Sequence, residues 1–550
     1  MATAPIRIGD LLISKGMLTK KQLQIALVQQ RVTGAILGDT LISLGFVTSH
    51  EFAETIAHQS GVDYVDLREF SISEEALRLI PKETARKSEY IPLEIRNGVL
   101  SIGVINPSNI MAVDTVRQFT GISPKVYMVD KDAYSDIIES AYYFVEHPVK
   151  QRLEDLSSKL KSGSSVQSSI VPELTDLLLM DGIRKKATDI HLTPSKEVLH
   201  VFYRIDGVLT YGHCLPRVFQ SSLASRIKIM ANLDIAEQRL PQDGSYTLDF
   251  LNKRYDLRIS TVPSIYGENI VIRVLSTSGS LISIAQLGLN ENLVTTMRSL
   301  FNKSHGIVLI TGPTGSGKTT TLYSCLRDID LLERNVITVE DPVEYRLNFV
   351  RQTEVNEKAG YTFASSARTF MRQDPDVMLL GEIRDTETAQ MAVRASITGH
   401  LVLSTLHTND AVTSIPRLLD LGMDKLLLSS SLLAVVAQRL SRKICLYCKE
   451  PYTVSESEKA TFKRAGLDVT TAYRGKGCER CDGSGYSGRT LIAEVMIIKA
   501  DIKEMIYSGA STGAIYQAAL KGGMVPMIVD GLRKAAGGQT TIVEILRVAG

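Results

Sequence analysis

A glycine-rich segment in the second half of the chain carries the strongest chemical signal. GPTGSGKT fits the pattern G-x-x-x-x-G-K-[ST], follows the apolar run IVLIT and precedes a stretch of helical character. Glycines in such a loop let backbone N–H groups approach phosphate oxygens at a helix N-terminus. We expect Lys318 to reach the β- and γ-phosphates of a nucleotide and Thr319 to hold Mg²⁺. The expected binding residues are Gly312, Pro313, Thr314, Gly315, Ser316, Gly317, Lys318, Thr319 and Thr320.

Two other segments place carboxylates after apolar runs. In VMLLGEIRD, Gly381 stands where a nucleotide hydrolase usually carries Asp, and Glu382 follows it. A carboxylate at a strand end can polarise an attacking water, so Glu382 is the predicted catalytic carboxylate. ITVEDPVEY adds acids that could help to hold Mg²⁺, namely Glu340, Asp341 and Glu344. Glu344 is a second catalytic candidate, although it could equally be a solvated carboxylate.

A histidine stands at each end of the apolar run HLVLSTLH. His400 starts the run and His407 ends it. An imidazole beside the γ-phosphate can distinguish ATP from ADP by hydrogen bonding. We therefore predict a functional role for His407, whereas His400 could be functional or structural.

Four of the six cysteines form two C-x₂-C pairs, Cys445 with Cys448 and Cys478 with Cys481. Two such pairs can close a tetrahedral Zn²⁺ site without an open position, which predicts a structural metal. A redox pair or an empty site remain alternatives. The long spacer between the pairs predicts a small helical lobe within residues 441–490. Cys214 and Cys325 are expected to be core cysteines.

The composition limits the classes of function. The chain has 550 residues, enough for three or four domains. Its formal net charge of +2 gives no overall case for binding to nucleic acid or membrane. No apolar run reaches the roughly 18 residues of a transmembrane helix, and the start MATAPIRIGD has no signal-peptide core. We therefore expect a cytosolic protein.

The elements that must position these residues follow from hydrophobic patterning. In residues 291–550, apolar runs such as GIVLITG and DVMLLGE alternate with helical stretches, which predicts a mostly parallel sheet with crossover helices. Sites in such folds lie at the carboxyl ends of the strands. Residues 171–290 predict a small α+β domain, with a helix at 172–187 and strands that turn at Asp206-Gly207 and near Asn252.

The N-terminal part predicts two further pieces. The serine-rich run SGSSVQSS indicates a flexible linker within residues 148–170. Residues 61–145 predict α/β structure, with a hairpin at Asn97-Gly98 and helices at 109–119 and 131–144. These boundaries give an N-terminal domain of residues 1–147.

A 24-residue motif occurs twice before this α/β part, at 7–30 and at 36–59. Each copy predicts a short helix, a glycine at the helix end and a longer helix. Matched pairs include Gly9 with Gly38, Leu12 with Leu41, Gly16 with Gly45, Leu23 with Phe52, Leu27 with Ile56, and Gln30 with Gln59.

The phosphate loop together with VEDPVE, LLGEIRD and STLHTNDA resembles the secretion ATPase superfamily that drives type II secretion and type IV pilus assembly. The resemblance implies an α/β fold: a RecA-like P-loop NTPase domain with a tetracysteine zinc lobe, preceded by a small PAS-like α+β domain and an N-terminal α-helical/α+β domain. It also implies arginines that neutralise phosphate charge, at Arg258, Arg273, Arg368 and Arg372. Arg204 and Arg239 lie in further family-like stretches and are interpreted as structural or interface residues.

The duplicated motif resembles the N-terminal domain of the MshE-type pilus ATPases, which bind cyclic di-GMP. One copy could hold each half of this pseudo-symmetric ligand, although the second copy has Ile36 where the first has Arg7. The alternative is a domain that only docks on a partner at the membrane. The residues implied to bind the ligand are Arg7, Ile8, Gly9, Asp10, Leu23, Leu27, Gln30, Leu37, Gly38, Asp39 and Gln59.

These resemblances favour a cytoplasmic hexameric ATPase motor that builds type IV pilus-like filaments of the MSHA type through an inner-membrane platform protein. They imply Mg²⁺ with ATP, structural Zn²⁺, and cyclic di-GMP as a regulatory ligand. A type II secretion ATPase shares every catalytic segment and remains the alternative. A RecA-like DNA translocase is disfavoured by the near-neutral charge and the lack of a basic, aromatic-rich stripe. A pure docking protein is disfavoured by the intact phosphate loop.

Overall fold

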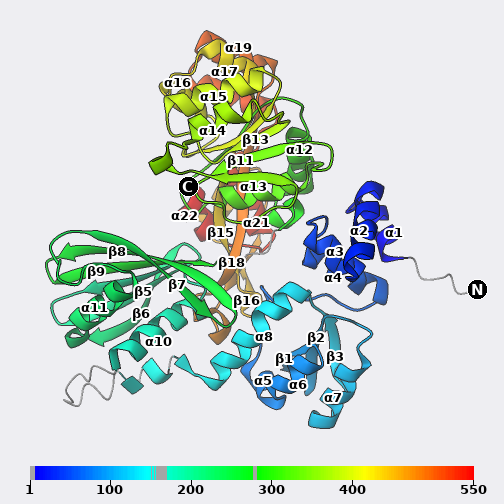
Figure 1. Ribbon diagram of the computed structural model, residues 1–550, viewed down its shortest axis with the longest axis vertical. Coiled ribbons are helices and arrows are strands. Elements are labelled where there is room, and N and C mark those ends of the chain that lie inside the picture. The colour runs from blue at the N-terminus through cyan, green and yellow to red at the C-terminus, as the bar shows by residue number, and fades with distance from the viewer. Residues whose placement is uncertain (1–6, 150, 154, 157–169, 277–281) are drawn as a thin grey trace, which may run out of the picture. The chain divides into compact units, whose positions relative to one another are not determined.

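The computed structural model describes residues 7–149, 151–153, 155–156, 170–276 and 282–550 (Figure 1). The chain divides into two compact units, one of Met1–Val32 with Ser49–Ser280 and one of Thr33–Thr48 with Leu281–Gly550. The serine-rich run expected to be a flexible linker lies outside the described residues. Among the helices that are described, none has the length and apolar composition required to cross a lipid bilayer.

Both copies of the repeat form a short helix, a glycine turn and a longer helix, as predicted. The turns match closely: the Gly16 N–H donates to Ile13 O and the Gly45 N–H donates to Ile42 O, both at 2.9 Å. Gly16 and Gly45 have φ of +70° and +75°, a conformation that favours glycine. The helices are α1 (Ile8–Ser14) and α2 (Lys20–Thr33) in the first copy, and α3 (Leu37–Ser43) and α4 (Ser49–Ser60) in the second.

The rest of the N-terminal region is an α/β structure with a three-stranded sheet in the order β1-β2-β3. The hairpin turns at Asn97-Gly98, as the sequence predicts. Side chains of Asn109 and Asp130 cap the helices α7 and α8 by accepting backbone N–H groups. The elements are α5 (Glu74–Leu79), α6 (Lys82–Lys87), β1 (Tyr90–Arg96), β2 (Val99–Val104), α7 (Ile110–Thr120), β3 (Lys125–Met128) and α8 (Lys131–Glu146).

The small α+β domain is a six-stranded antiparallel sheet in the order β6-β5-β4-β9-β8-β7, and Figure 1 shows it with its two helices. Its strands alternate buried and exposed residues, because only one face packs on the helices. The strand β4 was not expected from the sequence. The elements are α10 (Ile170–Arg184), β4 (Asp189–Pro194), β5 (Val198–Ile205), β6 (Val208–Pro216), α11 (Gln220–Met230), β7 (Gln242–Phe250), β8 (Lys253–Ser264) and β9 (Gly267–Ser276).

Helical residues precede this domain where the sequence analysis placed the start of the linker. Val149 and Leu153 are buried in the same hydrophobic core as α10 and the sheet. Because these apolar side chains find a packing surface, the ordered structure continues beyond residue 148.

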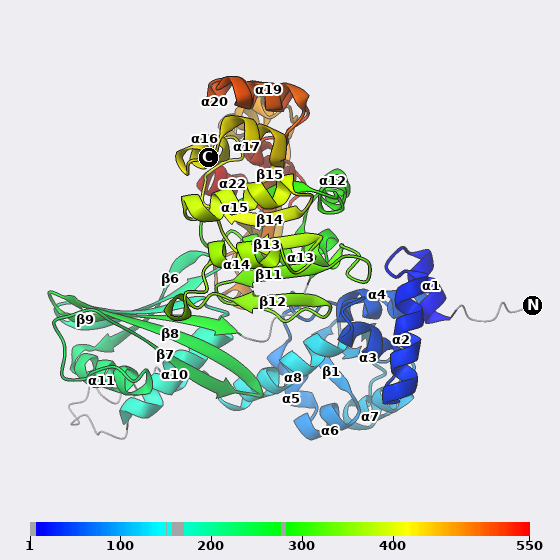
Figure 2. The same cartoon turned by 45° about the horizontal axis from the view of Figure 1, so that its top comes forward.

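The second unit is built on a seven-stranded sheet in the order β12-β11-β13-β14-β10-β15-β18. Every neighbouring pair is parallel except β15 with β18, so the prediction of a mostly parallel sheet is confirmed. Figure 2 shows β14, β13, β11 and β12 in succession across the sheet. The strands are β10 (Gly306–Thr311), β11 (Val336–Glu340), β12 (Val350–Glu354), β13 (Val377–Leu380), β14 (Leu401–Leu406), β15 (Leu432–Ile444) and β18 (Tyr486–Ile497).

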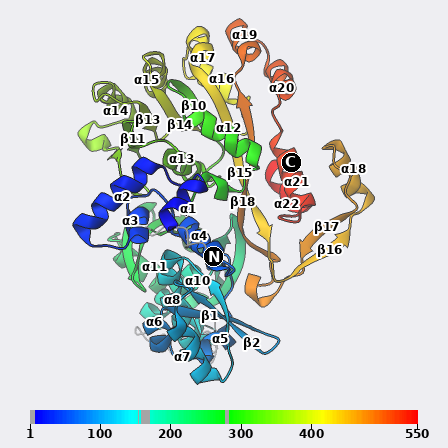
Figure 3. The same cartoon turned by 90° about the vertical axis from the view of Figure 1, so that its right-hand side faces the viewer.

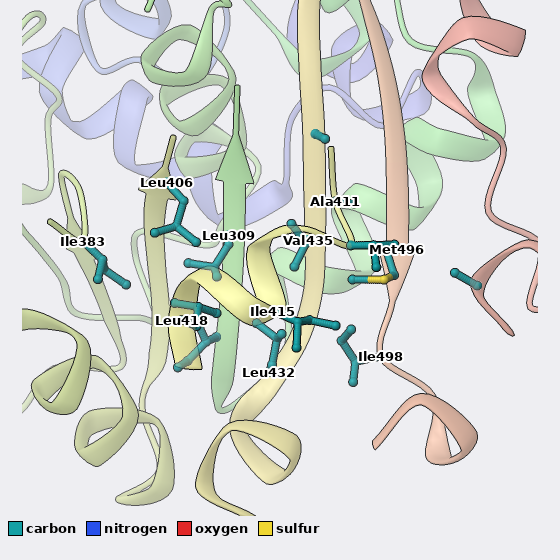
Figure 4. Packing of buried hydrophobic residues seen from close by; sticks show 14 of the residues in the cluster. Leu309, Ile383, Leu406, Ala411, Ile415, Leu418, Leu432, Val435, Met496 and Ile498 are labelled. Carbon is teal, nitrogen blue, oxygen red and sulfur yellow. The ribbon is translucent and has the colours of Figure 1, made fainter. Parts of the chain in front are cut away.

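Both faces of this sheet are buried. Alternate residues of β10 enter two different cores: Leu309 packs in one and Val308 and Ile310 in the other. Figure 4 shows the first core, where Ile415 and Leu418 approach the strands. Burial on both faces explains why the central strands β10, β11, β13 and β14 are mostly apolar, whereas the edge strand β12 is polar and partly exposed. The helices are α12 (Glu291–Phe301), α13 (Lys318–Arg327), α14 (Phe363–Phe370), α15 (Thr386–Ile397), α16 (Ser414–Asp420) and α17 (Lys425–Ser431).

The cysteine-bearing lobe projects from the ends of β15 and β18 (Figure 3). It holds a two-stranded antiparallel ribbon of β16 (Lys449–Thr453) and β17 (Thr471–Gly475) with one helix, α18 (Glu456–Arg464). The expected helical lobe is therefore wrong in part, because the segments beside the cysteines pair as strands. The chain ends in α19 (Ala500–Ser508), α20 (Thr512–Lys521), α21 (Met527–Ala536) and α22 (Ile542–Ala549).

A buried carboxylate ties the last helix to β15. Glu544 accepts hydrogen bonds from Arg442 at 2.8 Å and from Arg547 at 2.6 and 2.9 Å, and its side chain is fully buried. Burial opposes its charge, but the bonds from Arg547 and Arg442 outweigh that effect and lower the pKa of Glu544 to about 2.

We predict that Glu544→Gln lowers the free energy of unfolding of the second unit by about 3 kcal/mol at pH 7. The reason is that Arg442 keeps its charge but loses its buried carboxylate partner. The pKa of Glu544 in the folded chain lies below its value of roughly 4.3 in the unfolded chain. The stabilisation by Glu544 is therefore fully present above about pH 4.3 and declines as the pH falls toward 2. Urea unfolding of both proteins at pH 7, 4 and 3 measures this. The exposed Glu504→Gln on α19 is the control, and an equal deficit at all three pH values would contradict the assignment.

Candidate active site and cysteine cluster

The phosphate loop leaves the buried strand β10 and enters the N-terminus of α13, which begins at Lys318. Gly315 and Gly317 have φ of +79° and +87°. A Cβ at Gly312 would lie 2.5 Å from the backbone oxygen of Gln438 and 2.6 Å from Ser316 Oγ. Glycine is thus required both by the backbone conformation and by close packing. The loop residues Pro313 to Gly315 and the side chains of Thr319 and Thr320 are exposed.

Lys318 lies over its own loop. Its ammonium donates to the backbone oxygens of Gly312 at 2.8 Å and Pro313 at 3.2 Å. Burial lowers the pKa of Lys318, and the negative charge of Glu382 partly offsets this effect. A partly desolvated cation on a loop of this shape is suited to binding phosphate.

The structure brings Glu382 and His407 together. They follow the neighbouring parallel strands β13 and β14, and His407 Nε2 lies 3.2 Å from Glu382 Oε2. The Thr408 backbone N–H donates to Thr311 Oγ1 at 2.8 Å, which connects the histidine segment to the end of β10. His400 stands before the start of β14 and contacts Ala395 O at 2.8 Å, so it is a structural residue at the opposite end of the strand.

Arg384 is a residue of this site that the sequence analysis missed. Its guanidinium pairs with Glu382, and this hydrogen bond raises the pKa of Arg384 above its usual value. The signal was present in the sequence, because Arg384 stands two residues after Glu382 in GEIRD. Glu382 is therefore bracketed by two cationic or polarisable groups, Arg384 and His407.

Packing explains the glycine before Glu382. A Cβ at Gly381 would lie 3.0 Å from the ring of Phe363 and 3.2 Å from Val339 O. A side chain at this position would be tightly packed against both. The exposed acids after the neighbouring strand β11 are the remaining candidates for a metal ligand.

The acids after β11 divide into two groups. Glu340 is buried, accepts a hydrogen bond from Thr338 Oγ1 at 2.6 Å, and also accepts one from Tyr323 of α13. Burial and this bond raise the pKa of Tyr323. Glu340 is therefore a structural brace, whereas Asp341 and Glu344 are exposed at the end of the strand.

The predicted arginines are divided between the two units, with two in each. Arg368 of α14 is exposed and pairs with Glu387 of α15 at 2.6 Å, and the Arg372 guanidinium donates to Arg368 O at 3.4 Å. Arg258 and Arg273 face each other across β8 and β9 in the small domain.

Asp189 organises the arginines of the small domain. Its register neighbours are Arg204 on β5 and Arg273 on β9, and its carboxylate lies 3.6 Å and 3.1 Å from them. With Arg258, these side chains form one row across the sheet. Arg204 thus belongs to the same row as two predicted catalytic arginines, while Arg239 lies in the loop before β7.

The four cysteines of the lobe form one cluster. Their sulfurs lie within 4.8 Å of one another, and the Cys445–Cys478, Cys448–Cys481 and Cys478–Cys481 separations are 3.9, 3.9 and 3.7 Å. Zinc–sulfur bonds of about 2.3 Å in a tetrahedron place sulfurs about 3.8 Å apart, so the cluster fits zinc. Backbone N–H groups of Gly477 and Gly485 donate to two of the sulfurs. Cys325 is buried as expected, but Cys214 is exposed on the edge strand β6, which corrects its assignment to the core.

Comparisons with known proteins identify the family to which the chain belongs. Residues 164–547 match the type II/IV secretion system protein family, and residues 60–147 match the MshEN domain. The chain belongs to the type II/IV secretion system protein family. A type IV pilus assembly ATPase of Myxococcus xanthus is 36% identical over 561 aligned positions, covering 98% of both chains. A type II secretion system protein E of Xanthomonas campestris is equally 36% identical, covering 99% of both chains.

A solved structure supports the fold of this secretion-family protein. The ATPase DotB of Legionella pneumophila has a TM-score of 0.50 and 20% identity, and the match covers 68% of this chain and 95% of that one. With the phosphate loop and the full-length relatives, the chain is an ATPase of this family. The match to the MshEN domain begins at residue 60, after both copies of the repeat.

The repeat of this secretion-family ATPase presents part of each motif to solvent. In the first copy Arg7 and Asp10 are exposed, Ile8, Leu23 and Gln30 are half-buried, and Leu27 is 37% exposed. Gly9 is buried, and a Cβ there would lie 3.0 Å from both methyl groups of Leu23, so glycine permits α1 to pack on α2. In the second copy Gly38 is buried, Leu37 and Asp39 are half-buried, and Gln59 is exposed.

We predict that Glu382→Gln lowers ATP hydrolysis by roughly 10²–10⁴-fold while ADP binding persists, because the amide cannot accept a proton from water. Lys318→Ala is expected to abolish hydrolysis through loss of phosphate contacts. Steady-state phosphate release and ADP titration separate the two effects. The exposed Glu291→Gln at the start of α12 serves as control, and near-wild-type turnover in Glu382→Gln would overturn the assignment.

Proposed function

We propose that this ATPase is a cytoplasmic motor that assembles type IV pilus-like filaments of the MSHA type. It would act as a ring-shaped homohexamer on an inner-membrane platform protein. The observation that carries the proposal is the similarity over the whole chain to a pilus assembly ATPase, together with a duplicated N-terminal motif of matching local geometry. Filament type, hexamer and platform remain proposals, since they come from the family resemblance.

The site residues suggest how the cycle proceeds. Lys318 and the loop N–H groups bind the β- and γ-phosphates, and Thr319 with Asp341 or Glu344 would hold Mg²⁺, which supplies charge neutralisation at the phosphates. Glu382 orients the attacking water, and His407 reports on the γ-phosphate through its contact with Glu382. By the family resemblance, Arg258, Arg273, Arg368 and Arg372 would neutralise phosphate charge in the transition state.

Type II secretion is the second candidate function. It is supported by the type II secretion relative, which is as similar over the full length as the pilus relative. A DNA translocase would require that DNA stimulates ATP hydrolysis. The names of the two relatives describe pilus assembly and type II secretion. No nucleic-acid partner is proposed.

Cyclic di-GMP is the proposed regulator. The support is the repeat itself: both copies have an extended residue, Arg7 or Ile36, before the first helix, a buried glycine in its first turn and a buried leucine three residues after that glycine. Exposed Arg7 can pair with a phosphate or a guanine edge. The half-exposed leucines offer apolar contact to purine faces.

Calorimetric titration of cyclic di-GMP into the full chain tests this regulator. We expect saturable binding that Arg7→Ala weakens at least tenfold, because one charge-assisted contact is lost. Arg31→Ala on α2 is the control, since Arg31 is exposed and outside the motif. Absence of binding to a folded, ATP-hydrolysing chain would reduce the N-terminal domain to a docking role and leave pilus assembly and type II secretion equally supported.

We also propose that the cysteine cluster holds one structural Zn²⁺, with Cys445, Cys448, Cys478 and Cys481 as its ligands. Elemental analysis of the purified chain is expected to give one zinc per chain, and Cys478→Ser is expected to lose it, because three thiolates bind far less tightly than four. Cys214→Ser is the control and is expected to retain the metal. Unchanged zinc in Cys478→Ser would contradict the site.

A further inference from the structure

Gln438 is a buried polar residue beside the phosphate loop. It lies on β15, which pairs in parallel with β10 and includes the apolar residues Val435, Val436 and Ala437. The exposed fraction of Gln438 is 0%. A buried carboxamide costs free energy unless its contacts repay it, so its presence in this strand requires a reason.

Gln438 contacts the loop at both ends. Its side-chain Nε2 donates to the backbone oxygen of Ser316 at 2.9 Å. A Cβ added at Gly312 would lie 2.5 Å from the backbone oxygen of Gln438. A Cβ added at Gly317 would lie 3.4 Å from Gln438 Nε2. Gln438 thus packs closely against the first glycine of the loop and against the peptide group that precedes α13.

The hydrogen bond fixes the direction of a peptide group. In a trans peptide the carbonyl and the following N–H point in opposite directions, so a Ser316 carbonyl that faces Gln438 turns the Gly317 N–H away from β15. The same contact fixes the orientation of the Gln438 side-chain amide, because only the amide nitrogen can donate a hydrogen bond to the Ser316 carbonyl. Gln438 Oε1 has no hydrogen-bond partner among the described residues.

We propose that Gln438 is a positioning residue that holds the phosphate loop in its anion-binding shape. It touches the loop backbone rather than the reacting atoms. With the Ser316 carbonyl held by Gln438, the Gly317 N–H points away from β15 and is available to phosphate oxygens. The inference depends on nucleotide binding, which family membership establishes, and it is independent of the filament assembled and of cyclic di-GMP.

The test compares nucleotide affinity with turnover in the full chain. Gln438→Met keeps length and burial but removes the donor. We expect the Kd of ADP and the KM of ATP to rise about tenfold, because the Ser316 carbonyl loses its partner and the loop relaxes, while kcat at saturating ATP changes less than threefold. Gln438→Asn is a second variant whose shorter amide cannot reach Ser316, and it is expected to behave alike.

Ser441→Ala is the matched control. Ser441 is buried on the same strand, and its hydroxyl contacts only Thr490 O, at 3.5 Å, among the hydrogen bonds of the described residues. We expect wild-type Kd and KM for it. Thermal unfolding midpoints show which variants fold. An ADP Kd within twofold of wild type in either folded Gln438 variant would overturn the proposal. A fall in kcat without a rise in the ADP Kd of the Gln438 variants would also overturn it. A rise in the ADP Kd of Ser441→Ala equal to that of the Gln438 variants would overturn it as well.

Discussion

The register between the parallel strands of the second unit is the constraint on which the active site depends. Because β10, β13 and β14 are buried on both faces, each strand must keep its position, and their carboxyl ends meet at one edge. The phosphate loop, Glu382 and His407 each follow one of these ends. Thr311 and Thr408 bond across two of them, so a shift of one strand would separate lysine, glutamate and histidine together.

Support for the loop comes from elements that are distant in sequence. β15 braces the loop through Gln438, and Tyr323 of α13 joins the buried Glu340 of β11. β15 ends at Ile444, so the strand that supports the loop leads directly to Cys445, the first cysteine of the cluster. Buried carboxylates fasten the C-terminal helices to β15 and β18: Glu544 of α22 bonds to Arg442 of β15, and Asp530 of α21 accepts a hydrogen bond from the Ala493 N–H of β18 at 3.2 Å. The catalytic edge and the cysteine lobe therefore share one framework.

The first unit combines two kinds of polar arrangement. In the small domain, Asp189 holds Arg204 and Arg273 in a row that spans neighbouring strands, which keeps cationic side chains ordered on an exposed sheet face. In the repeat, the exposed Arg7 precedes α1 and the exposed Asp10 lies in its first turn, whereas Gly9 and Leu12 of the same helix are buried. Each arrangement leaves cationic side chains at least partly exposed to solvent.

Much of this followed from residues close together in sequence. The phosphate loop, the hairpin at Asn97-Gly98, the repeat and the cysteine pairs were predictable because local chemistry and spacing specify them. The strand β4, the ribbon in the cysteine lobe, the exposure of Cys214 and the roles of Glu340, Arg384 and Gln438 were not, since each depends on a partner from another element. The sequence by itself determined which groups could do chemistry, through residue type and local periodicity. The tertiary structure decided which of them meet, because strand register and burial bring together residues that are far apart along the chain.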